Sequence, residues 1–188
     1  MRKLHLYFLL SINFFVSLGF VYSQQKEYDK DKALYKAKYF IAKTLGDEPG
    51  LSKFMIDPLA ASKSTELTSI YFESPKHKKK GLVLGFFDDF WTRESGKGFE
   101  GYGFKHLNQQ EATELLNKIE TIISDEKKFL NANDDENNIY FTFDDITVLI
   151  YRKGALSGRL RLFWNGFDAE WENTAFRRTK RRFEKSVK

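Results

Sequence analysis

Three strand-like segments in the second half of the chain, at 139–143, 146–152 and 159–164, are separated only by short turns. They are rich in β-branched and aromatic residues, as strands are. Strands joined by turns this short pair antiparallel, because a parallel pair needs a crossover of a dozen or more residues. We therefore expect an antiparallel sheet in this half of the chain.

The remaining elements are predicted from apolar periodicity and turn residues. A hairpin is predicted from strands at 67–73 and 81–91, and helices are predicted at 27–45 and 173–187. The clearest helix begins at Asn108, where Glu111 completes a capping box, and it carries apolar residues at 112, 115, 116, 119, 122 and 123. The expected fold is α+β, with an antiparallel sheet of about five strands, helices packed on one face and the order α-β-β-α-β-β-β-α.

The N-terminus has the pattern of an export signal. Arg2 and Lys3 precede an apolar run at 4–22, which is followed by the small residue Ser23. This predicts a signal peptide at 1–23, and an uncleaved membrane anchor is the alternative. Residues 24–188 then form a single exported α+β domain with a basic C-terminal helix, in the periplasm or outside the cell. The chain has no cysteine, so its 19 Phe, 9 Tyr and 3 Trp must supply a core without disulfides.

Positive charge is concentrated at the C-terminal end. Residues 177–188 hold seven basic residues and one acidic residue, whereas the whole chain has a net charge of +5. Arg177, Arg178, Arg181 and Arg182 are candidates for peripheral contact with an anionic membrane surface. The alternative is a solvated helix face whose cations favour the negative end of the helix dipole.

Motifs for cofactors and metals are incomplete. Residues 96–101 match G-x-G-x-x-G, but the next predicted helix begins too late for its N-terminus to hold a pyrophosphate. This glycine-rich stretch, 92–105, is expected to be an ordered loop. Residues 131–137 carry oxygen ligands at alternate positions but lack the Gly and Glu of an EF-hand. His77 and His106 are the only histidines after residue 23, and no zinc motif accompanies them. We expect no cofactor and no metal.

Acidic residues beside tryptophans leave one catalytic hypothesis open. Asp88, Asp89, Asp168, Glu170 and Glu172 lie close in sequence to Trp91, Trp164 and Trp171. A pair of carboxyl groups in an aromatic cleft could hydrolyse a glycan, although the separation that such a mechanism needs cannot be read from sequence. The alternative is that these acids occupy turns or precede a helix.

One predicted sheet face carries aromatic and cationic side chains. Alternation places Arg159, Arg161 and Phe163 opposite Leu160, Leu162 and Trp164. Such a face can stack sugar rings or contact a protein, and the alternative is an ordinary solvated face. The candidate binding residues are Tyr140, Tyr151, Arg159 and Arg161 of this face, together with Phe99 and Tyr102 of the glycine-rich stretch.

These patterns favour a non-enzymatic binding or interaction domain exported to the bacterial envelope or the secreted space. The expected partner is an envelope protein or a glycan, and export disfavours nucleic acid. The alternative function is a carboxylate-dependent hydrolase of glycans or peptidoglycan. Residues 86–91 faintly resemble 163–168, but two short aromatic runs are too little to predict a repeat.

Overall fold

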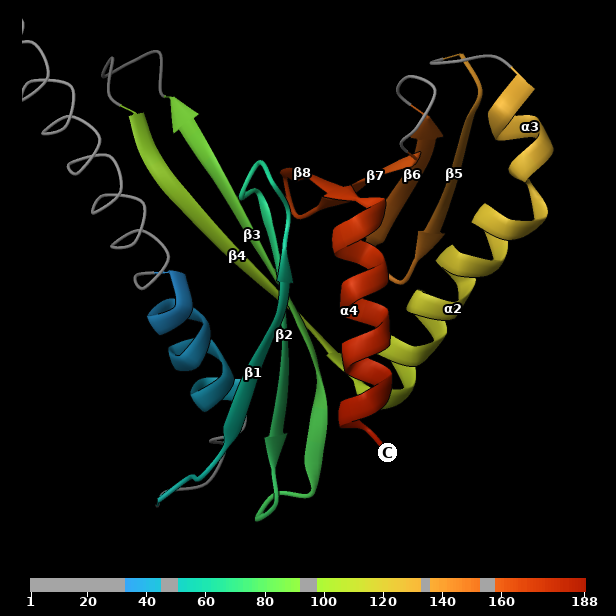
Figure 1. Cartoon of the computed structure of the whole chain (residues 1–188). Helices are drawn as coiled ribbons and strands as arrows, with labels where there is room; N and C mark the ends of the chain where they lie inside the picture. The colour runs from blue at the N-terminus through green and yellow to red at the C-terminus, as the bar shows by residue number, and fades with distance from the viewer. Residues whose placement is uncertain (1–32, 45–50, 92–97, 133–135, 153–157) are drawn as a thin grey trace, which may run out of the picture. The chain divides into compact units, whose positions relative to one another are not determined.

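The computed structural model describes residues 33–44, 51–91, 98–132, 136–152 and 158–188 (Figure 1). It divides into two compact units, Met1–Tyr39 and Phe40–Lys188. Residues 33–44 form a helix, as predicted for this part of 27–45. The predicted signal peptide at 1–23 lies outside the described residues.

The second unit is α+β, as predicted, and consists of antiparallel strands and helices. The elements are β1 (Met55–Ala61), β2 (Leu67–Ser74), β3 (Lys79–Trp91), β4 (Gly98–Asn108), α2 (Gln109–Asp125), α3 (Lys127–Ala132), β5 (Asn138–Phe143), β6 (Ile146–Arg152), β7 (Gly158–Trp164), β8 (Phe167–Glu172) and α4 (Asn173–Ser186). The strands form two four-stranded sheets, β1-β2-β3-β4 (sheet A) and β5-β6-β7-β8 (sheet B). The expectation of about five strands in one sheet is therefore wrong.

Three strands, β1, β4 and β8, were not predicted from the sequence, each for a local reason. β1 contains Pro58, and its pairing with β2 shifts register between Pro58 and Ala60, so a regular alternation is lost. β8 alternates acidic with apolar residues, and its acids resemble the start of the following helix. β4 contains the glycines that predicted a loop.

The glycine-rich segment is a strand from Gly98 onward, so the predicted loop is wrong there, and 92–97 lie outside the described residues. A Cβ added at Gly103 would lie 2.5 Å from the ring of Phe167 and 2.9 Å from that of Trp164. Glycine is needed at this position because two aromatic rings occupy the space of a side chain. The same strand geometry excludes the tight turn into a helix that nucleotide binding requires.

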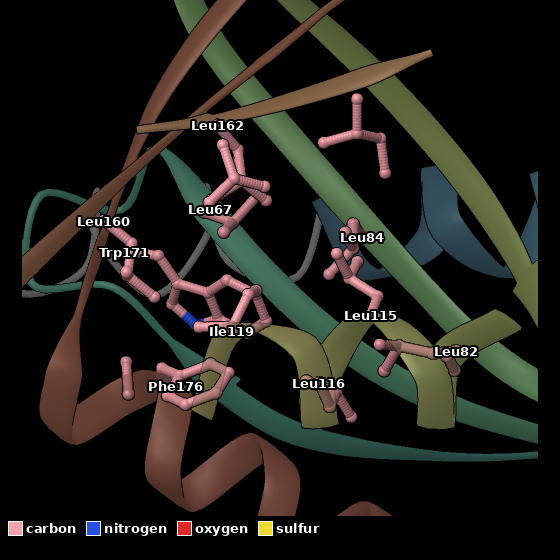
Figure 2. Close-up of a cluster of buried hydrophobic side chains, with 14 of the residues drawn as sticks. Leu67, Leu82, Leu84, Leu115, Leu116, Ile119, Leu160, Leu162, Trp171 and Phe176 are labelled. Carbon is pink, nitrogen blue, oxygen red and sulfur yellow. The ribbon is translucent and has the colours of Figure 1, made fainter. Parts of the chain in front are cut away.

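One apolar core joins both sheets to α2 and α4. Figure 2 shows the centre of this core. The two sheets contribute Leu67, Leu82 and Leu84 from sheet A and Leu160, Leu162 and Trp171 from sheet B. The helices contribute Leu115, Leu116 and Ile119 from α2 and Phe176 from α4. The ring of Trp171 meets that of Phe176 edge-on, with 5.3 Å between centroids. The core therefore lies on the inner face of each sheet, and the opposite face of sheet B is left outside it.

The helix ends and one buried hydrogen bond hold the helices in place. At the start of α2 the side chain of Asn108 accepts from the Glu111 amide at 3.0 Å, and the Glu111 carboxylate accepts from the Asn108 amide at 2.9 Å. This confirms the predicted capping box. In the interior, the hydroxyls of Ser69 on β2 and Thr179 on α4 lie 2.6 Å apart.

The two halves of the second unit share one element order, a four-stranded meander followed by a helix. The weakly similar segments 86–91 and 163–168 both include the end of the third strand of their meander. They also meet in space, because the ring centroid of Phe86 lies 5.3 Å from that of Trp164 and 6.0 Å from that of Phe167. The aromatic similarity therefore marks the contact between the two sheets.

Candidate binding face of sheet B and an adjoining cavity

The outer face of sheet B consists of three cross-strand rows. In register these rows are Asn138–Tyr151–Arg159–Glu172, Tyr140–Leu149–Arg161–Glu170 and Thr142–Thr147–Phe163–Asp168. The intervening residues face the core, where Val148 and Leu162 are fully buried and Ile139 and Phe141 of β5 are partly buried. The structure thus brings Tyr140, Tyr151 and both arginines to one face, as the alternation predicts.

Both arginines of this face are paired with acids of β8. Arg159 donates through Nη1 to Oε1 of Glu170, and Arg161 donates through Nε to Oδ1 of Asp168 at 2.6 Å. The hydrogen bond that Arg161 donates to Asp168 is the main cause that raises the pKa of Arg161, and a hydrogen bond with Tyr151 adds to it. The ion pairs therefore hold both guanidinium groups along the sheet rather than extended into solvent.

Two aromatic side chains on the outer face are open to solvent. Tyr140 is 76% exposed and Phe163 is 37% exposed. Most large aromatic residues of a small domain are packed, so exposed rings on an ordered sheet are a feature that binding surfaces share. Tyr140 stands in the same cross-strand row as Arg161.

The two remaining predicted residues lie on the other sheet. Tyr102 is on β4, where it pairs with Phe87 at 5.0 Å between ring centroids, and it alternates with the core-facing residues of that strand. Phe99 is also on β4, where its backbone pairs with that of Phe90 on β3, and its side chain is not among those described. Neither residue joins the four of the sheet B face.

The acidic residues of the hydrolase hypothesis lie on two different sheets. Asp88 and Asp89 are consecutive in β3, so their side chains point to opposite faces. Asp168 and Glu170 hold the two arginines, and Oε1 of Glu172 accepts from the amide of Lys63 at 2.7 Å. These carboxylates therefore fix the sheet and its neighbouring turn.

The histidines are separate from this face. His106 lies on β4 with its ring 5.2 Å from that of Phe72, and burial lowers the pKa of its imidazole despite the opposing effect of Glu111. His77 is in the turn after β2. Within the described ranges no cluster of His, Asp or Glu is arranged to hold a metal ion.

A cavity of about 800 Å³ opens at the end of sheet B where β6 and β7 meet the helices. Its walls come from the C-terminal part of α2, from α3, from the β6–β7 end and from the first turns of α4. Tyr151 and Arg159 line it as well as standing in the rows of the outer face. Sequence analysis missed this cavity because its walls come from segments far apart in the chain, with no local motif.

The basic residues of α4 have different environments. Arg177, Arg178 and Arg181 are exposed. Arg182 is half-buried and donates to the carbonyl of Leu59 at 3.0 Å and to Asp57 at 3.1 Å. Arg182 therefore fastens α4 to β1, and three of the four predicted arginines remain on the solvent side.

None of the helices in the described parts of the chain is long and apolar enough to cross a membrane. Comparisons with protein-family models, with curated proteins and with solved structures give no match to this chain.

Proposed function

We propose that this chain is an exported binding domain of the bacterial envelope or the secreted space, and that the outer face of sheet B engages an envelope protein or a glycan. The observation that carries the proposal is Tyr140, which is 76% exposed on β5, an edge strand of sheet B, in one cross-strand row with Arg161. A rigid, amphipathic ring at such a position offers contact area at a small cost in conformational entropy.

The arginines support the same reading because pairing leaves donors available. A guanidinium has five N–H donors, and the acids of β8 take only part of them. Since the acids already hold the groups in place, a partner need not order them, which lowers the entropic cost of binding. Aromatic residues and arginine are also the types enriched at the energetic centres of protein interfaces.

The experiment that tests this function is site-specific photocrosslinking in the native cells. A photoreactive phenylalanine analogue replaces Tyr140 in the tagged chain, and the matched control replaces Met55, which is 59% exposed on β1 of the other sheet. The proposal expects a discrete crosslinked species from position 140 that position 55 does not give. Mass spectrometry and a glycosidase digest then identify the partner as protein or glycan.

Equal crosslinking from both positions, or none from position 140, would reject the outer face as the binding surface. Recovery of the tagged chain in the cytoplasmic fraction alone would reject the exported location.

A further inference from the structure

The cavity beside sheet B combines an apolar floor with a basic rim. The floor is formed by side chains that also belong to the core or pack against it, namely Ile123, Leu130, Ile150, Leu160 and Phe176. A volume of about 800 Å³ is in the range of pockets that take small molecules, about 300–1,000 Å³. The cavity is therefore large enough for an apolar chain.

The charges around the cavity favour an anion. Its lining includes the four basic residues Lys127, Arg152, Arg159 and Arg177, against the two acids Glu120 and Asp125. Glu120 is paired with Lys180 at 3.0 Å, and Arg159 is paired with Glu170. Setting both pairs aside leaves the three basic residues Lys127, Arg152 and Arg177 against Asp125. Positive potential in a cavity with apolar walls is stronger than on an open surface, because the surroundings screen it less.

Two lining residues also present buried polar atoms that lack a partner within the described residues. They are Nε of Arg159, a donor, and Oδ1 of Asn173, an acceptor. Buried polar groups are nearly always hydrogen-bonded. An anionic head accepts hydrogen bonds only, so it could pair with Nε of Arg159 but not with Oδ1 of Asn173. Asn173 is the first residue of α4, whose N-cap Glu172 makes no side-chain cap hydrogen bond.

We infer that this cavity binds a small anionic amphiphile, with its apolar chain against Ile123, Ile150 and Phe176 and its anionic head among the basic groups at the start of α4. A carboxylate or sulfate head would accept hydrogen bonds from the guanidinium groups of the rim. Tyr140 does not line the cavity, although Tyr151 and Arg159 belong to both the cavity and the outer face of sheet B.

The inference is tested by measuring the binding of decanoate to the purified full chain with isothermal titration calorimetry. Decyltrimethylammonium has the same chain length and the opposite charge, and it serves as the control ligand. The inference expects one saturable site that takes decanoate at least tenfold more tightly than the cation.

Two arginines of α4 give a matched pair of variants. Arg177 lines the cavity, whereas the neighbouring Arg178 is also exposed and does not line it. Arg177→Glu should weaken decanoate binding at least tenfold, and Arg178→Glu, with the same change in net charge, should alter it less than threefold. A third variant, Ile123→Trp, fills the cavity from the apolar side and should also weaken decanoate at least tenfold. Circular dichroism confirms that each variant is folded.

Several outcomes would overturn the inference. They are equal affinity for the two amphiphiles, equal losses from both arginine variants, unchanged affinity of Ile123→Trp, and the absence of a saturable site. Because Tyr140→Ala leaves the cavity intact, it should retain decanoate binding whether or not the sheet face binds a partner.

Discussion

Arg161 on β7 donates through Nε to Oδ1 of Asp168 on β8, 2.6 Å away, although its direct cross-strand partner is Glu170. Arg159 likewise pairs with Glu170 rather than with its own cross-strand partner, Glu172. Both arginines thus lean one row along the sheet in the same direction. The outer face of sheet B is in this way an ordered array rather than a set of independent solvated side chains.

Neighbouring residues of β7 should differ sharply in their effect on stability. Leu162 is fully buried, so Leu162→Ala should lower the free energy of unfolding by about 2–5 kcal/mol. Arg161 is 32% exposed and its partner 45%, so Arg161→Ala should cost less than about 1 kcal/mol. Urea denaturation of both variants measures the difference. Similar losses from the two substitutions would contradict the assignment of inner and outer faces.

Glycine at position 103 should be required for the contact between the sheets. Gly103→Ala places a Cβ against the rings of Phe167 and Trp164, and relieving this clash should cost about 1–3 kcal/mol. Gly158→Ala is the control, since the nearest atom to its Cβ, Nδ2 of Asn173, is 4.0 Å away. The midpoints of thermal unfolding of the two variants give the comparison. Equal stability of Gly103→Ala and Gly158→Ala would contradict the close contact between the sheets at Gly103.

His106 should contribute to a loss of stability in acid. Burial lowers its pKa in the folded state below the ordinary value of 6.5, so the unfolded chain binds the proton more readily. The contribution of the neutral imidazole is then intact above pH 6.5 and is lost as the pH falls below it. The midpoint of thermal unfolding should therefore drop less between pH 7.5 and pH 5 in His106→Gln than in the parent chain. Parallel pH profiles would show that this histidine is not buried as described.

The predicted signal peptide can be checked on the mature protein. Cleavage after Ser23 would leave a chain that begins at Gln24. Intact-mass measurement of the exported protein should give the mass of residues 24–188. A mass that includes residues 1–23 would instead support the membrane-anchor alternative.

Sequence patterns correctly predicted the elements whose conformation depends on residues close together in the sequence. The periodicity of α2, its capping box and the alternation of β7 are local, and the structure confirms them. The prediction failed where a distant contact decides the conformation. Gly103 belongs to the glycine-rich stretch that predicted a loop. The rings of Trp164 and Phe167, which require a glycine there, come from β7 and β8, far away in the sequence. The eight strands form two sheets that share one core with α2 and α4, an arrangement that no local pattern reveals.

The candidate site shows the same division. Alternation placed Arg159 and Arg161 on one face correctly, but it could not show that acids of β8 hold them, because β8 itself was not predicted. Tyr102 is a candidate binding residue of the predicted glycine-rich loop, and the structure places it on β4 of sheet A. The cavity had no signal in the sequence, since its lining spans α2 to α4.

The most direct test of the binding face is the affinity of surface variants for the partner that crosslinks at position 140. Tyr140→Ala removes a side chain that is 76% exposed, so it should leave folding unchanged and weaken binding at least tenfold. Met55→Ala, which removes a 59% exposed side chain on sheet A, should bind as the parent chain does. If Tyr140→Ala also binds like the parent chain, the outer face of sheet B is not the surface that recognises the partner.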